Sequence, residues 1–169
     1  MLFTTKSKGA YLMKFLWIVF LPFCINVFAD IKFDHIPISA VESFWNKMPC
    51  NIEHSKLPIS KEFFDEVERV RYQGEPHIPL FAEFTKWHGK KVLEIGCGIG
   101  TEAINFARAG AYYTAIELSN KSLDLTRTRF KIHGLSARLV HGDAEELEKY
   151  FSGEKFDLIW SHGVIHHLP

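Results

Sequence analysis

The chain has 169 residues, 47% of them hydrophobic, and its 20 basic residues are balanced by 20 acidic residues. These values describe a globular domain and give no net positive field that would favour a nucleic-acid partner. The three cysteines, Cys24, Cys50 and Cys97, are widely spaced and include no C-x-x-C pair, so neither a disulfide framework nor a zinc site is predicted from them.

Residues 1–29 form a hydrophobic N-terminal segment. Residues 15–25 carry no charge, Lys14 precedes them, and small residues stand before Asp30, where a signal peptidase would cut. The uncharged run has the length of a signal-peptide core, about 7–15 residues, and is short for a membrane span of about 20. The alternatives are a cleaved signal peptide, a hydrophobic anchor that contacts a membrane through residues 15–29, and an upstream start that is not the true one.

Residues 39–88 are predicted to form a helical leader. Helices are expected over 39–49, 60–72 and 80–89. In the last of these, Leu80, Phe84 and Trp87 recur at the spacing of one helix face. This spacing favours a packed core face over an aromatic platform for an adenine or a substrate.

An apolar strand followed by alternating glycines occupies residues 91–100. The strand is the run 91–95, which has the character of a buried parallel strand, and the glycines are Gly96, Gly98 and Gly100. Glycines let the chain reverse tightly and leave no side chain between backbone and ligand. A helix is predicted directly afterwards, so its N–H groups and positive dipole end face the same place. The sequence therefore predicts a site for a polar or anionic ligand at this turn.

Two further residues of this stretch have specific interpretations. Glu94 stands inside the apolar strand, where an unpaired carboxylate would cost several kcal/mol, so we expect it to meet a hydrogen-bond donor or a cation. Cys97 is interpreted as a small packing residue rather than a nucleophile, because the sequence places no base beside it. Gly100 stands one residue earlier than the dinucleotide fingerprint requires, which argues against a nicotinamide cofactor.

Three more strands are predicted after the glycine turn. The elements are a helix over 101–109, a strand over 113–118, a helix over 119–133, a strand over 137–141, a short helix near 145–148 and a strand over 156–161. Glu117 ends the second strand, and in a parallel βαβ unit a carboxylate there can accept hydrogen bonds from both hydroxyls of a ribose. Asp143 follows the third strand and has a plain turn residue as its alternative interpretation.

Histidines follow the fourth predicted strand at His162, His166 and His167. His162 and His166 have one-turn spacing on a helix, but no carboxylate or cysteine follows them, so no metal site is predicted. His162 as a general base is a second alternative, with only its position to support it.

In combination, these motifs resemble class I S-adenosylmethionine-dependent methyltransferases. Glu94 with the alternating glycines resembles the first motif of that family, and Glu117, Asp143 and residues 156–169 follow in the right order. Residues 44–51 and 75–78 resemble the helical leader of one bacterial branch. The resemblance covers roughly residues 44–169. It implies an α/β fold, a Rossmann-like doubly wound parallel sheet of which residues 89–169 hold the first four strands, preceded by a helical leader that lies against the cofactor cleft.

The resemblance also implies the chemistry. The cofactor would be S-adenosylmethionine, and a methyl group would pass to an unidentified acceptor, a small molecule rather than a macromolecule. The implied cofactor-binding residues are Glu94, Gly96, Cys97, Gly98, Gly100, Glu117, Leu118, Asp143, Ala144 and Ser161. Within this set, Glu94 would hold the amino group of the cofactor, Asp143 the adenine edge and Ser161 the methionine part. No catalytic residue is assigned, and a nicotinamide-dependent oxidoreductase or a non-catalytic binding module are the alternative functions.

The family's sheet continues with three more strands, whereas this sequence stops at Pro169. We therefore expect the fourth strand to be an open, apolar edge that is prone to aggregation or pairs with a partner chain. S-adenosylmethionine is made in the cytosol, so a cytoplasmic or membrane-attached enzyme is expected, with export through a signal peptide as the alternative.

Overall fold

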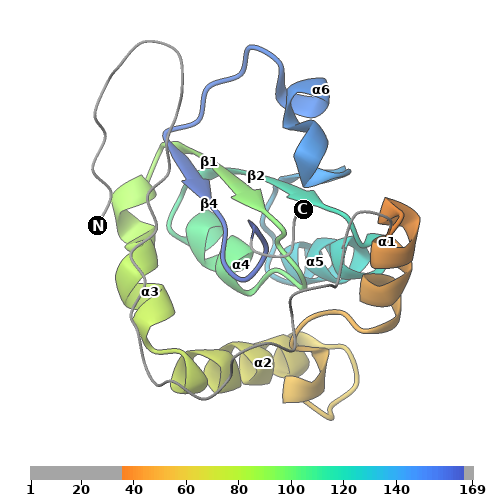
Figure 1. Ribbon diagram of the computed structural model, residues 1–169. Helices are drawn as coiled ribbons and strands as arrows, with labels where there is room; N and C mark the ends of the chain where they lie inside the picture. The colour runs from red at the N-terminus through yellow and green to blue at the C-terminus, as the bar shows by residue number, and fades with distance from the viewer. Residues whose placement is uncertain (1–35, 166–169) are drawn as a thin grey trace, which may run out of the picture. The chain divides into compact units, whose positions relative to one another are not determined.

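The computed structural model describes residues 36–165 (Figure 1). The N-terminal segment 1–29 lies outside the described residues, and so do His166 and His167, so the expectations for them stay predictions. Within 36–165, no helix combines the length and the apolar character that crossing a membrane requires.

A four-stranded parallel sheet forms the centre of the fold. Its order is β3–β2–β1–β4, with bounds Arg138–His141, Tyr112–Glu117, Lys91–Ile95 and Leu158–Trp160. The chain runs outward from β1 to β2 and β3, then returns to the other side of β1, where Glu94 pairs with Trp160. Ligands of such sheets bind outside the carboxyl ends of the strands at this reversal. The predicted Rossmann-like, doubly wound sheet is confirmed.

Helices cover both faces of the sheet (Figure 1). The connections α4 (Thr101–Arg108) and α5 (Asn120–Ile132) pack on the face that carries Val92 and Ala115. The short helices η3 (Ala144–Glu146) and α6 (Leu147–Phe151) lie on the opposite face with Leu93 and Ile95. Successive residues of a strand point to opposite faces, which is why β1 is apolar on both sides.

The leader consists of short helices that precede the sheet. Their bounds are α1 Ile38–Lys47, η1 Ile52–His54, α2 Lys61–Gly74, α3 His77–Ala82 and η2 Phe84–Trp87. The side chain of Ser60 caps α2 by accepting a hydrogen bond from the backbone N–H of Phe63 at 3.2 Å. Phe63 and Val67 pack against Ile99 and Leu125, so α2 joins the core on the α4–α5 side.

The prediction of one continuous helix over 80–89 is wrong. The chain breaks at Glu83, which has the left-handed angle φ +45°, and Leu80 is 78% exposed instead of facing the core. At roughly 100° per residue, one continuous helix would place Phe84 about 200° from the buried Ala82, on nearly the opposite side. The break turns Phe84 onto Phe106, with ring centroids 4.8 Å apart, while Ile78 stays buried.

Within residues 36–165, β4 is one of the two edge strands of the sheet, and β3 is the other. Strand β4 pairs with β1 alone, and Ile159 on it is 59% exposed. The pairing of β4 with a partner chain stays a prediction.

Candidate functional site

The glycine turn after β1 is built from left-handed backbone conformations. Gly96 has φ +75° and Gly98 has φ +52°. A Cβ atom on Gly96 would lie 2.3 Å from the side chain of Val164, so close packing also requires glycine there. A Cβ atom on Gly98 would meet nothing within 4 Å, so the space beside this residue is open. The turn therefore combines a packed side at Gly96 with free space at Gly98.

Glu117 ties this turn to the end of β2. Its carboxylate accepts hydrogen bonds from the backbone N–H of Gly98 and from that of Ser119, each at 2.8 Å, and the residue is 8% exposed. Burial raises the pKa of Glu117 above its ordinary value, and the N–H groups of Ser119 and Gly98 oppose this rise. Each carboxylate oxygen has a further lone pair, so Glu117 can still accept hydrogen bonds from a ligand.

Glu94 lies in β1, buried on the α4–α5 face. The hydrogen-bond donor expected for it is the hydroxyl of Tyr113, which donates to Oε2 at 2.5 Å. Burial, together with the nearby carboxylate of Glu102, raises the pKa of Glu94 well above its ordinary value. Glu94 therefore belongs to a buried polar cluster beneath the turn.

Cys97 packs inside the turn. Its thiol is buried and lies 3.8 Å from the hydroxyl of Thr126, which donates to the carbonyl of Gly98 at 2.8 Å. Burial raises the pKa of the thiol well above its ordinary value, so the nucleophilic thiolate is disfavoured. These properties agree with a packing residue.

The ends of β3 and β4 bring the other predicted residues to the same edge. The N–H of Gly142 donates to the carbonyl of Glu117 at 3.1 Å, which places the segment with Asp143 and Ala144 beside the end of β2. Asp143 caps η3, because its Oδ1 accepts a hydrogen bond from the backbone N–H of Glu145 at 2.9 Å. It therefore acts as a turn residue, and its other carboxylate oxygen takes no part in this cap.

Ser161 and Leu118 complete the set of predicted residues. The hydroxyl of Ser161 donates to the carbonyl of Ile95 at 3.3 Å, which holds the segment after β4 against the start of the glycine turn. Leu118 follows Glu117, and its carbonyl accepts a bond from Nε2 of His141 at 2.9 Å. All ten predicted residues thus lie in β1 and the turn that follows it, or where β2, β3 and β4 end.

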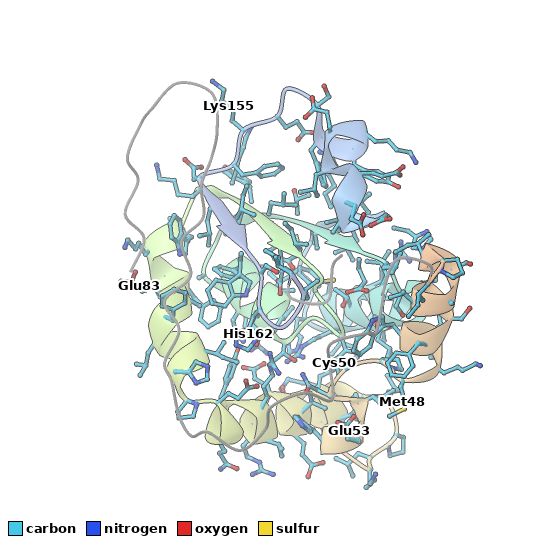
Figure 2. All side chains as sticks on the ribbon, in the orientation of Figure 1. Met48, Cys50, Glu53, Glu83, Lys155 and His162 are labelled. Carbon is cyan, nitrogen blue, oxygen red and sulfur yellow. The ribbon has the colours of Figure 1, made fainter. Side chains whose placement is uncertain are left out.

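Sequence reasoning missed a buried cation at this edge. Arg71 of α2 donates from Nε to Glu102 at 2.7 Å, from one terminal nitrogen to Glu75 at 2.9 Å, and from the other to Nδ1 of His162 at 3.1 Å. His162, labelled in Figure 2, thus lies against the leader. Burial alone would lower the pKa of Arg71, but the carboxylates of Glu102 and Glu75 raise it overall. Arg71 therefore joins the leader to α4 and to the segment after β4.

The leader also reaches the start of α5. The side-chain oxygen of Asn46 in α1 accepts hydrogen bonds from the hydroxyl of Ser119 at 2.9 Å and from the N–H of Lys121 at 3.0 Å. Ser119 itself caps α5, and Glu42 of α1 accepts a bond from Asn120 at 3.2 Å. No residue of α1 is fully buried, so polar contacts hold α1 beside Glu117.

Asn46→Ala is expected to loosen α1 and to lower the free energy of unfolding by about 0.5–1.5 kcal/mol, because two hydrogen bonds lose their acceptor. Trypsin cleavage after Lys47, followed by mass spectrometry, should be faster in this variant. Asn46→Asp is the matched control, since its carboxylate can accept the same two bonds. Equal cleavage rates of the alanine and aspartate variants would contradict this account of α1.

Comparisons with known proteins agree with this geometry. Residues 92–169 match the family model described as a methyltransferase domain. The chain is similar to a ubiquinone biosynthesis O-methyltransferase of Aromatoleum aromaticum, with 38% identity over 81 residues, 48% of this chain and 34% of that protein. It is also similar to a fatty-acid O-methyltransferase of Mycolicibacterium smegmatis, with 37% identity over 115 residues, 67% of this chain and 39% of that protein. The chain thus spans less than two fifths of the length of these relatives.

A solved structure supports the fold. The magnesium protoporphyrin IX methyltransferase of Synechocystis, solved with bound S-adenosylmethionine, aligns over 78% of this chain and 64% of its own, with TM-score 0.57 and 18% sequence identity. At this identity the likeness concerns the fold alone. The nicotinamide alternative is not favoured by the matching family model. The glycine turn and the buried Glu117 both lie inside the matched range: residues 92–169 form a methyltransferase domain, and the fold agrees with that of class I S-adenosylmethionine-dependent methyltransferases.

Proposed function

We propose that the chain binds S-adenosylmethionine at the carboxyl edge of its sheet and serves the transfer of the methyl group to a small-molecule acceptor. The observation that carries this proposal is the arrangement at Glu117. A buried carboxylate bridges the glycine turn and the start of α5, and it keeps lone pairs free beside the open space at Gly98. A ligand that offers two neighbouring hydroxyls, as a ribose does, suits such a carboxylate.

The remaining residues would hold other parts of the cofactor. Gly96, Gly98 and Gly100 would let the methionine and ribose parts approach the backbone, with Cys97 packing beneath them. Asp143 would face the adenine edge through the oxygen that does not cap η3, beside Leu118 and Ala144. Ser161 would approach the methionine part. Glu94 is buried and bonded to Tyr113, which favours contact with the amino group through water.

When bound, S-adenosylmethionine supplies an activated methyl group that an acceptor nucleophile can take by direct displacement. The residues of this chain need form no covalent intermediate. Their work is to bind and orient the cofactor and to keep water out of the site, and orientation by itself contributes strongly to such reactions. The leader, residues 39–88, would cover the cofactor site, because α1 and α2 contact the segments beside Glu117 and Glu102.

An oxygen acceptor on a small molecule is the proposed substrate class. The support is the names of two relatives, an O-methyltransferase of ubiquinone biosynthesis and a fatty-acid O-methyltransferase. A cytoplasmic or membrane-attached location is proposed because S-adenosylmethionine is made in the cytosol. A partner chain at the exposed edge strand β4 is proposed on the apolar character of that edge.

Glu117→Ala tests this function. The variant should bind S-adenosylhomocysteine more weakly by about 1–3 kcal/mol in calorimetry, because charge-assisted hydrogen bonds to the ligand are lost. Glu154→Ala is the matched control. Glu154 follows α6, is exposed, and pairs with Arg138 of β3. Thermal unfolding of both variants would distinguish weaker ligand binding from a loss of folding stability. Unchanged affinity in Glu117→Ala, or binding of NADH in place of S-adenosylhomocysteine by the unaltered chain, would contradict the proposal.

A further inference from the structure

Three side chains that can ligate a metal converge beside the residues proposed to hold the cofactor. They are Glu75, directly after α2, His77 at the start of α3, and His162 after β4. One ligand atom from each lies within 4.8 Å of the other two. His77 is exposed and the other two are half-buried, so an ion from solvent can reach them.

The cluster has fixed and adjustable parts. The ring of His162 stacks nearly parallel to that of Trp160, at 12° and with centroids 6.4 Å apart, and its Nε2 lies 3.9 Å from Oε1 of Glu75. The ring of His77 lies 5.9 Å from that of His162. Ligands about 2.1 Å from a tetrahedral metal are about 3.4 Å apart, so the three ligand atoms, which lie within 4.8 Å of one another, must close by up to about 1.4 Å. Because His77 is exposed, rotation of its side chain can supply this movement.

The charge around the cluster favours a cation over an anion. Arg71 faces two carboxylates, Glu102 and Glu75, which leaves one negative charge in excess when the histidines are neutral. Arg71 engages Oε2 of Glu75, whereas the oxygen nearest to His162 is Oε1. A carboxylate ligand that is oriented by a second hydrogen bond in this way is usual around bound metals.

The contact between Arg71 and His162 sets a condition on metal binding. A guanidinium only donates, so Nδ1 of His162 accepts and Nε2 carries the proton. Coordination through Nε2 moves this proton to Nδ1 and breaks that contact. Arg71 keeps its bonds to Glu102 and Glu75, so the buried cation stays paired.

We propose that Glu75, His77 and His162 bind a divalent cation such as Zn²⁺, for which Co²⁺ is a spectroscopic probe, with the remaining coordination positions open to water or another ligand. Two imidazoles and one carboxylate suit a borderline metal, and three protein ligands leave a position free. The ion would tie the junction of α2 and α3 to the segment after β4. The expectation of no metal site considered only residues near His162 in the sequence, whereas Glu75 and His77 precede it by more than 80 positions. This proposal does not depend on the proposed function.

Titration of the full chain with Co²⁺ tests the site. The expected result is saturation at one ion per chain, with the visible absorption of four- or five-coordinate cobalt, and displacement by Zn²⁺. His77→Gln should weaken Co²⁺ binding by about tenfold or more, and Glu75→Gln should do the same. His88→Gln is the matched control, because His88 is also an exposed histidine but precedes the amino end of β1. This control should bind Co²⁺ as the unaltered chain does.

Thermal unfolding provides a second readout. Zn²⁺ should raise the melting temperature of the unaltered chain and of His88→Gln, but not that of His77→Gln, because an ion bound only by the native state stabilises it. Absence of the cobalt absorption, or equal Co²⁺ affinity of His77→Gln and His88→Gln, would overturn the metal site. S-adenosylhomocysteine binding, measured on the same samples, reports on the proposed function separately, and His77→Gln should retain it.

Discussion

Arg71→Met is expected to lower the free energy of unfolding by about 3–5 kcal/mol. Arg71 is 9% exposed, and its partner Glu102 is buried in the first turn of α4. Methionine keeps much of the side-chain volume but leaves the carboxylate of Glu102 without its cation in a poorly solvated place. Urea unfolding followed by circular dichroism would measure the loss.

Arg69→Met is the matched control for this prediction. Arg69 belongs to the same helix but is exposed, and its partners among residues 36–165, Gln73 and Glu66, also lie in α2. Its replacement should change stability by about 0.5 kcal/mol or less. Adding Glu102→Gln to Arg71→Met should recover part of the loss, because the unpaired charge is removed. Equal effects of the Arg71 and Arg69 variants would contradict the role of Arg71 as the buried link.

Gly98→Ala is expected to separate binding from stability. The left-handed angle φ +52° makes alanine unfavourable by about 1–2 kcal/mol. The added methyl group meets no atom within 4 Å, so the fold can accept it. If the proposed function holds, this methyl group occupies space that the cofactor needs. Calorimetry should then show S-adenosylhomocysteine binding about tenfold weaker or more, equivalent to ~1.4 kcal/mol.

Gly134→Ala provides a close comparison for this variant. Gly134 also has a positive φ, +63°, and open space around its Cβ position, but it follows α5 at the other end of the helix from Glu117. Its replacement should lower stability by a similar amount and leave S-adenosylhomocysteine binding unchanged. The same affinity in both alanine variants would remove Gly98 from the binding site.

Secondary structure was predictable where neighbouring residues decide it. The helix caps at Ser60 and Ser119 are examples, since each hydroxyl accepts a bond from an N–H three residues ahead. The prediction failed over 80–89, where periodicity suggested one helix. There, a break at Glu83 lets both the buried Ala82 and the partly buried Phe84 pack against the same core. The apolar spacing showed that these residues pack, but not in which direction each one points.

The sequence by itself determined the strand, the glycine turn and the acidic residue that ends β2, because these depend on residues close in the chain and on the parallel βαβ connection. It thereby predicted the methyltransferase domain and the edge of the sheet at which we propose that a ligand binds. Only the tertiary structure decided what surrounds that edge. Arg71 meets Glu102 across 31 positions and His162 across 91, and Asn46 meets Ser119 across 73. Such pairings arise from how helices pack on the sheet, and a pattern of charges along one helix looks the same whether its partner is water or a buried carboxylate.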